Sequence, residues 1–228
     1  GLVYYEGEYH LFYQHNPYGW NWGNMTWGHA VSKDLVHWEE LGDAIHPDAF
    51  GTIFSGSAVV DDKNTTGFQQ GTEKPLVAVY TYAGDTNLSS SGVKFTQALA
   101  FSNDRGRSWT KCADNPVLGH INGGNRDPKA FWHEPSGQWV IVLYLDDHRM
   151  GFFTSKDLKQ WEMQSELKCF HECPELFQLA QDGDTTKQPW ILYGAAGDYF
   201  VGNFDGKTYT SGGEPLHFNY GNCFYASQ

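Results

Sequence analysis

One short phrase, found twice and then a third time in a looser form, most constrains what this chain can fold into. Residues 32–38 read Ser-Lys-Asp-Leu-Val-His-Trp, residues 155–161 read Ser-Lys-Asp-Leu-Lys-Gln-Trp, and residues 102–109 hold a copy that is one residue longer. In each copy a predicted strand ends in Ser, the chain turns at Asp, and a new strand begins at Trp. Such a turn, recurring at roughly 50 to 70 residues, is typical of the four-stranded blades of a β-propeller. Ordinary hairpin turns in a β-sandwich favour the same residues, and a sandwich is the alternative fold.

The segments between these turns divide into blades. We predict strands of blade one at 2–5, 9–14, 26–32 and 36–40, and of blade two at 53–60, 76–82, 96–102 and 109–112. Blade three is predicted at 127–132, 139–145, 150–155 and 161–163, and blade four at 173–179, 189–195, 199–204 and weakly near Thr208. Residues 217–227 would begin a fifth blade. The polar segment 61–74 is predicted to be an exposed loop, and no segment has helical periodicity.

Composition supports an all-β protein and argues against charged polymers as partners. Aromatic residues make up 16% of the chain, Gly is frequent at 26, and charged residues are only 18%. This profile is typical of strands joined by tight turns. The net charge of −12 argues against nucleic acid and anionic membranes, because both bind basic surfaces. A neutral ligand that stacks on aromatic rings, such as a carbohydrate, fits better.

Neither the cysteines nor the histidines have the spacing of a metal site. The four Cys lack paired C-x-x-C spacing, and the ten His include no H-E-x-x-H motif, so we predict no metal and no cofactor. The even number of Cys permits disulfides without requiring them. No apolar run is long enough to cross a membrane.

The stretch 169–180 contains the strongest candidate for a catalytic residue. Glu172 precedes Cys173, Pro174 and a short apolar run, and a second carboxylate follows at Glu175. Pro174 cannot donate to a sheet ladder and so marks the start of a strand. Glu172 would then lie at the mouth of a sheet, where burial raises a carboxyl pKa and suits it to general acid catalysis near neutral pH. Taken alone, a Glu before a strand is more often a solvated charge at the strand end, and the other motifs of the chain favour the catalytic interpretation.

In a propeller the first strand of every blade lines the central axis, so residues at the starts of these strands converge. The candidate starts are residues 54–57, 126–128 and 172–174. Blades three and four would each bring a carboxylate, Asp127 and Glu172, to the same funnel. A pair of carboxylates on either side of one bond is what glycoside hydrolysis requires. By itself, Arg126-Asp127-Pro128 could equally be a turn with a salt bridge.

The order of the motifs along the chain resembles glycoside hydrolase family 32, the family of invertases, inulinases and levanases. The resemblance covers the whole chain and is carried by Gly1-Leu2-Val3-Tyr4-Tyr5, Phe12-Tyr13-Gln14-His15-Asn16-Pro17, the segment 27–38, Phe54-Ser55-Gly56-Ser57, Arg126-Asp127-Pro128 and Glu172-Cys173-Pro174. It implies a five-bladed catalytic propeller and a retaining mechanism on β-fructofuranosides such as sucrose, inulin or levan. It also implies that no cofactor is needed and that the protein acts in an extracellular or periplasmic space.

The resemblance assigns roles to individual residues. Glu172 would be the acid/base, and Asp127, with Arg126 beside it, would grip the fructose hydroxyls and stabilise the oxocarbenium-like transition state. Four further positions match the fructose pocket, where the aromatic side chains would form apolar walls and the polar ones would form hydrogen bonds: Gln14, Trp22, Phe54 and Ser55.

The chain departs from the family pattern at both ends. The family nucleophile is the Asp of an Asn-Asp-Pro-Asn-Gly motif, and this chain begins at what resembles the final Gly. We therefore expect the nucleophile to precede Gly1 and the polypeptide as given to be nearly inactive. Residues 221–227 resemble the first strand of blade five, with Cys223 where the family often has Asp. We expect residues 1–228 to be a partial catalytic propeller of about four blades plus that strand, without the rest of blade five and the C-terminal β-sandwich.

Three alternatives stay open at this point. The chain could be another five-bladed furanosidase, a non-catalytic fructoside-binding pseudoenzyme, or a fructosyltransferase whose covalent intermediate is captured by a sugar instead of water. Sucrose, inulin and levan are not separated by the sequence. Residues 172–179 and 222–228 are more similar to microbial fructanases than to plant invertases.

Overall fold

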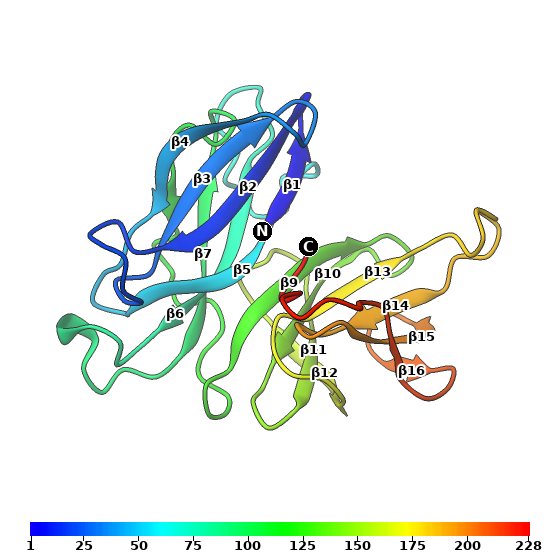
Figure 1. Cartoon of the computed structure of the whole chain (residues 1–228). Coiled ribbons are helices and arrows are strands. Elements are labelled where there is room, and N and C mark those ends of the chain that lie inside the picture. Colours follow the sequence, from blue (N-terminus) through cyan, green and yellow to red (C-terminus); the bar gives the residue numbers. More distant parts are fainter.

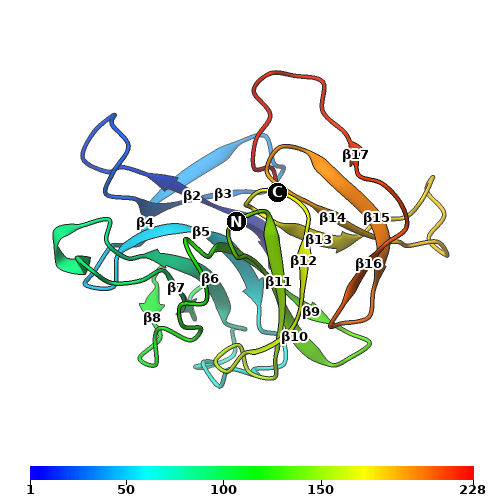
Figure 2. The ribbon, with the colours of Figure 1, turned by 90° about the horizontal axis from the view of Figure 1, so that it is seen from below.

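The computed structural model describes residues 1–228 and contains four antiparallel sheets arranged around a common axis (Figure 1, Figure 2). Blade one consists of β1 (Leu2–Tyr5), β2 (Glu8–His15), β3 (Thr26–Ser32) and β4 (Trp38–Ile45). Blade two consists of β5 (Thr52–Val60), β6 (Leu76–Ala83), β7 (Thr96–Ser102) and β8 (Thr110–Lys111). Blade three consists of β9 (Arg126–His133), β10 (Gln138–Tyr144), β11 (Arg149–Ser155) and β12 (Glu162–Lys168). Blade four consists of β13 (Glu175–Gln178), β14 (Trp190–Tyr193), β15 (Asp198–Phe204) and β16 (Tyr209–Ser211).

Strands follow one another across each blade in chain order, which confirms the predicted all-β propeller arrangement. Every predicted strand of blades one to three overlaps a strand of the structure, and so do those of blade four. The outer strands β4 and β12 extend further than predicted. Both are mostly polar and exposed and pair through bulged registers, so they lack the alternating apolar pattern that reveals a strand.

The strand expected over 217–227 as the opening of a fifth blade is not formed. Instead β17 (Leu216–His217) pairs with β15 of blade four. The rest of this segment has no neighbouring strand, and it turns back to the axis. There its backbone makes single hydrogen bonds, from Ala226 N to Ala195 O at 2.9 Å and from Phe218 N to Gly197 O at 3.2 Å. A strand needs a partner ladder to satisfy its backbone, and none lies beside these residues.

The repeated phrase forms the turn between the third and fourth strands of a blade. Asp34 Oδ1 accepts hydrogen bonds from Val36 N at 2.9 Å and His37 N at 2.8 Å. Asp157 Oδ1 accepts from the two equivalent backbone groups at 2.9 and 3.0 Å. The Asp at the turn is therefore a structural residue that closes the turn by binding backbone N–H groups.

Blade four contains a fourth copy of this turn that the sequence comparison missed. Asp205 Oδ1 accepts from Lys207 N at 2.8 Å and from Thr208 N at 2.7 Å, as the other turn aspartates do. The copy is hard to recognise because Asn203 replaces the Ser and Tyr209 replaces the Trp. The geometry of the turn is kept although, of the Ser, Asp and Trp that define the repeated phrase, only the Asp remains.

Each of these turns except the first packs on the blade before it. Gly106, at φ +78°, lies against the rings of His10 and His29 in blade one, where a Cβ would come within 2.9 Å of His29 Cε1. Leu158 is fully buried in the cluster shared with blade two, and Gly206 lies against His133 of blade three. By contrast Leu35, the matching residue of blade one, is 46% exposed.

The hydrophobic core is divided into three clusters, each lying between two neighbouring blades. One joins blades one and two around Trp27 and Tyr80, the next joins blades two and three around Val79 and Ile141, and the last joins blades three and four. Sheets in a propeller bury both faces against neighbours, which explains why β3, β6 and β7 are buried along nearly their whole length.

The segment 61–74 is largely exposed, as predicted, but it is not a free excursion. Asp61 is completely buried, and its carboxylate accepts hydrogen bonds from the backbone and hydroxyl groups of Thr65 and Thr66 at 2.7 to 3.0 Å. Phe68 packs against the core between blades two and three. A buried carboxylate therefore anchors the loop. The polar composition of the segment does not indicate this anchor.

Helical structure is confined to the short 3₁₀ turn η1 (Leu88–Ser90), and no helix has the length and apolar character needed to cross a membrane. All four cysteines are free.

Candidate functional site

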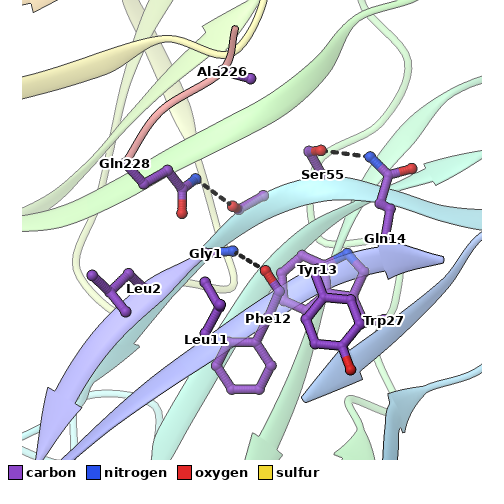
Figure 3. A pocket seen from close by; sticks show the side chains of 11 residues that line it. Gly1, Leu2, Leu11, Phe12, Tyr13, Gln14, Trp27, Ser55, Ala226 and Gln228 are labelled. Atoms are coloured by element: carbon purple, nitrogen blue, oxygen red, sulfur yellow. Dashed lines mark hydrogen bonds between the residues drawn. The ribbon is translucent and has the colours of Figure 1, made fainter. Parts of the chain in front are cut away.

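The first half of the site is built where β5 begins. The register of β5 against β6 shifts between Phe54 and Gly56, so Ser55 is released from the ladder. Gly56 is required at this bulge, because a Cβ there would lie 2.0 Å from Val79 O. Ser55 Oγ accepts a hydrogen bond from Gln14 Nε2 of the neighbouring strand β2 at 2.6 Å (Figure 3).

Aromatic rings flank this polar pair. The Trp22 and Phe54 rings meet edge to face, with centroids 6.0 Å apart, and Phe54 meets Phe95 in the same way at 5.6 Å. Trp27 Nε1 of strand β3 donates to the carbonyl of Phe54 at 2.9 Å and fixes the start of β5. The four predicted pocket residues Gln14, Trp22, Phe54 and Ser55 are thus brought together.

A cavity of about 300 Å³ opens beside Gln14 and Ser55 and is floored by Phe12, Trp27 and the start of the chain (Figure 3). Ala226 and Gln228 close its other side, and Gln228 Nε2 donates to Gly56 O at 3.4 Å. A second hollow of about 50 Å³ shares Ser55 and Gly56 with the first and is also lined by Asp127, Cys173 and Glu175. The two hollows join the polar pair to the carboxylates at the axis.

Asp127 occupies the second residue of β9 and is only 6% exposed. Its φ of +61° lies in the left-handed region, which a non-glycine residue rarely adopts and which often marks a functional position. The backbone is held there by a hydrogen bond from Asp127 N to Thr81 Oγ1 at 3.0 Å. The carboxylate accepts from Cys173 N at 3.2 Å and from Cys173 Sγ at 3.4 Å.

Burial and the charge of Glu172 raise the pKa of Asp127 to about 6, with Arg126 and the Cys173 hydrogen bonds opposing the shift. A carboxyl group that titrates close to pH 6 in a cleft is a candidate functional group.

Arg126 joins the two carboxylates. Its Nε donates to Glu172 Oε2 at 2.7 Å and lies 3.8 Å from Asp127 Oδ2. The guanidinium is itself fixed by a hydrogen bond from Nη1 to Gly124 O at 2.7 Å and by stacking 4.8 Å over the ring of Tyr144. A planar, oriented cation of this kind holds carboxylates in defined positions.

Glu172 lies three residues before β13, as predicted, but the predicted rise of its pKa is wrong. Burial does raise the pKa, yet hydrogen bonds from Tyr225 and Arg126 more than offset burial, so the pKa lies below its ordinary value. Tyr225 Oη donates to Glu172 Oε1, and His171 Nε2 lies 3.6 Å from the same oxygen.

Several site residues were not foreseen from the sequence. Tyr225 reaches Glu172 from a segment that was expected to be a strand. Thr81 supports Asp127 through one hydrogen bond and Cys173 through two. Glu175 is nearly buried and pairs with Lys129 Nζ at 2.6 Å, so this second carboxylate of the stretch 169–180 is neutralised at the axis. Lys129, the positively charged residue two positions after Asp127, could have indicated a partner for Glu175 from the sequence.

No three His, Cys, Asp or Glu side chains lie together in a way that could hold a metal ion. The arrangement instead offers two carboxylates on one guanidinium, next to a pocket with an amide, a hydroxyl and aromatic walls. Chemically, this set can bind sugar hydroxyls and move a proton.

Comparison with protein-family models matches residues 1–228 to the glycosyl hydrolases family 32 N-terminal domain. Among curated proteins, a levanase of Bacillus subtilis is 48% identical over 248 residues, covering 100% of this chain and 36% of that protein. An extracellular exo-inulinase of Aspergillus niger is 37% identical, covering 100% of this chain and 51% of that protein. The chain therefore spans between about a third and a half of the length of these relatives.

Solved structures show the same fold. A β-fructofuranosidase from Schwanniomyces occidentalis complexed with fructosyl-erythritol is 34% identical with a TM-score of 0.88, covering 99% of this chain and 47% of that one. An exo-inulinase from Aspergillus awamori is 38% identical with a TM-score of 0.81, covering 93% and 48% of the two chains.

Proposed function

The chain belongs to glycosyl hydrolase family 32, and on this premise we propose that the protein hydrolyses terminal β-D-fructofuranosyl residues of fructans or sucrose with retention of configuration. The observation that carries the proposal is that Arg126 holds Glu172 and Asp127 together beside the Gln14–Ser55 pocket. Relatives named levanase and exo-inulinase favour a fructan, and the extracellular relatives favour a secreted protein. Residues 1–228 then form part of its catalytic propeller.

Glu172 is proposed to donate a proton to the leaving glycosidic oxygen and later to take one from water. In the free site, Tyr225 and Arg126 favour its carboxylate form. A sugar oxygen that takes the place of the Tyr225 hydroxyl removes one of these hydrogen bonds. The pKa of Glu172 then rises toward the range that a general acid needs.

Asp127 is proposed to bind fructose hydroxyls and to stabilise the positive charge that develops on the sugar ring. Its ionised form does this best, because the charges are opposite. The family nucleophile is the Asp of the Asn-Asp-Pro-Asn-Gly motif, and Glu175, which is paired with Lys129, is not assigned this role. Gln14 and Ser55 complete the pocket with hydrogen bonds to the same sugar.

The test compares the whole protein, of which residues 1–228 are proposed to be a part, with its Glu172→Gln variant on sucrose, inulin and levan, measuring fructose release and the anomer first formed. We expect Glu172→Gln to lower kcat by about 10²–10⁴-fold, as for loss of a general acid. The control is Glu162→Gln, an exposed carboxylate on β12, which should leave kcat unchanged. Binding of these sugars without fructose release by the unaltered protein would replace this proposal with the pseudoenzyme alternative.

A further inference from the structure

The loop of residues 16–24, which we call the aromatic loop, exposes three large aromatic side chains. Tyr18 is 83% exposed, Trp20 is 105% exposed and Trp22 is 73% exposed. The loop leaves the end of β2 two residues after Gln14 and projects from blade one (Figure 1). Burying aromatic rings is strongly favourable, so three of them held in water on one short loop indicate a surface that something else covers.

The aromatic loop is preformed rather than loose. Asn16 Nδ2 donates to Asn21 O at 2.7 Å, and Asn16 Oδ1 accepts from Tyr18 N at 3.0 Å and from Asn24 Nδ2 at 3.4 Å. One amide side chain thereby ties the two ends and the middle of the loop together. A ligand that binds to a preformed surface loses less affinity to the ordering of that surface.

The polar groups of the three rings are also free. No acceptor or donor in the chain pairs with the Tyr18 hydroxyl or with the indole N–H groups of Trp20 and Trp22. In contrast, five other Trp side chains donate to protein acceptors: Trp27, Trp38, Trp109, Trp139 and Trp161. The loop has no charged residue, so it presents ring faces and neutral donors, which suit an uncharged ligand rich in hydroxyl groups.

The loop adjoins the sugar pocket. Trp22 contacts Phe54, and Phe54 is followed by Ser55, which accepts from Gln14. Trp22 therefore lies beside the pocket through Phe54, and Trp20 and Tyr18 come two and four residues earlier on the same loop. A chain whose terminal unit fills the pocket must leave the pocket past its rim.

We propose that Tyr18 and Trp20 form a platform for the second and third sugar units of a fructan whose terminal fructose occupies the Gln14–Ser55 pocket. The proposal rests on the proposed function and adds chain length as the property that the protein selects. A disaccharide reaches the platform little or not at all, whereas a longer chain stacks on it. The platform thus favours fructans over sucrose.

The experiment measures kcat/KM for sucrose, for an inulin-type trisaccharide and tetrasaccharide, and for inulin, in the protein and in Trp20→Ala, Tyr18→Ala and Trp20→Phe. We expect Trp20→Ala to lower kcat/KM on the longer chains by about 2- to 13-fold more than on sucrose, mainly through KM, the range for one aromatic contact. Trp20→Phe should recover most of the loss. Leu179→Ala, which removes a 57% exposed apolar side chain in blade four, should leave kcat/KM unchanged on sucrose and on the longer chains.

Equal losses on sucrose and on inulin, or no loss on either, would overturn the platform while leaving the proposed function standing. If the unaltered protein releases no fructose, affinity electrophoresis in gels containing inulin tests the platform separately. Inulin should then retard the protein and Leu179→Ala alike, and Trp20→Ala clearly less. Retardation that is equal in all three, or absent in all three, would refute the platform. Thermal unfolding of each variant checks that it is folded.

Discussion

At the scale of single residues, the two carboxylates of the site differ because their surroundings differ. Asp127 is buried and shares the field of Glu172, so its pKa is raised to about 6, whereas Glu172 is held below its ordinary pKa by donors from Arg126 and Tyr225. Arg126 therefore favours the charged form of both groups, but burial prevails only at Asp127. The protonation state of the free site near pH 6 is set mainly by Asp127.

The pH dependence of stability should report Asp127 directly. The folded pKa of about 6 exceeds the ordinary 3.8, so the folded state binds more protons between these values and loses stability as pH rises through 6. Asp127→Asn removes this cost. It should increase the free energy of unfolding by about 1–3 kcal/mol at pH 7.5 and by much less at pH 4.5, although fructose release falls strongly.

Urea unfolding at the two pH values measures this difference. Equal effects of Asp127→Asn at pH 4.5 and pH 7.5 would show that the carboxyl group is not strained by burial. We also expect kcat/KM of the unaltered protein to fall below about pH 6 as Asp127 takes up a proton. The small residual kcat/KM of Asp127→Asn should not show this fall, because the variant lacks the carboxyl group.

At the scale of elements, the recurring turn determines how the blades are joined. Its Asp closes the turn through backbone N–H groups, and in blades two, three and four the turn packs on the preceding blade through Gly106, Leu158 and Gly206. Leu158 and Leu35 hold the same place in two copies and share a left-handed φ of +62° and +63°. They differ in burial, since Leu158 is fully buried and Leu35 is 46% exposed.

This pair of leucines provides a matched test of the joint between blades. Leu158→Ala should lower the free energy of unfolding by about 2–4 kcal/mol, because it leaves a cavity in the cluster between blades two and three. Leu35→Ala should cost less than about 1 kcal/mol. Chemical denaturation of both variants measures the difference, and similar costs at the two positions would contradict the proposed joint.

The sequence predicted the elements well where a local rule governs them and poorly where a distant partner does. Pro174 located β13, and the repeated Ser-Asp-Trp turn located the turn between the last two strands of blades one to three. Asp127 lies at the start of an inner strand and Glu172 just before one, as predicted. The hydrogen bond from Tyr225 to Glu172 was not predictable, because it joins segments far apart in the chain. Together with the hydrogen bond and charge of Arg126, that contact lowers the pKa of Glu172 although burial raises it.

At the scale of the whole molecule, stability resides between blades, since each apolar cluster is shared by two of them. The buried histidines His10 and His29, 3.1 Å apart, lie where the turn of blade two covers blade one. Burial and the neighbouring charge of His10 lower the pKa of His29 to about 3. The folded state therefore keeps both rings neutral while the unfolded chain takes up protons below about pH 6.5.

Acid should accordingly weaken the contact between blades one and two. As pH falls from 6.5 toward 3, His29 contributes a loss of stability, because its folded pKa is depressed. His29→Gln should flatten the decline of the unfolding free energy over this window, even if it lowers stability at pH 7. Equilibrium unfolding from pH 7 to pH 4 measures the slope, and an unchanged slope would exclude His29 as its source.

The way in which Gly106 covers the two histidines also orders the events of synthesis. Blade one ends its own strands at Ile45, but its buried His10 and His29 are covered by Gly106 of blade two, which follows much later in the chain. The same delay recurs at Leu158 and Gly206. The packing of blades one to three is therefore completed only by residues of the following blade, so we expect folding during synthesis to lag translation by about one blade.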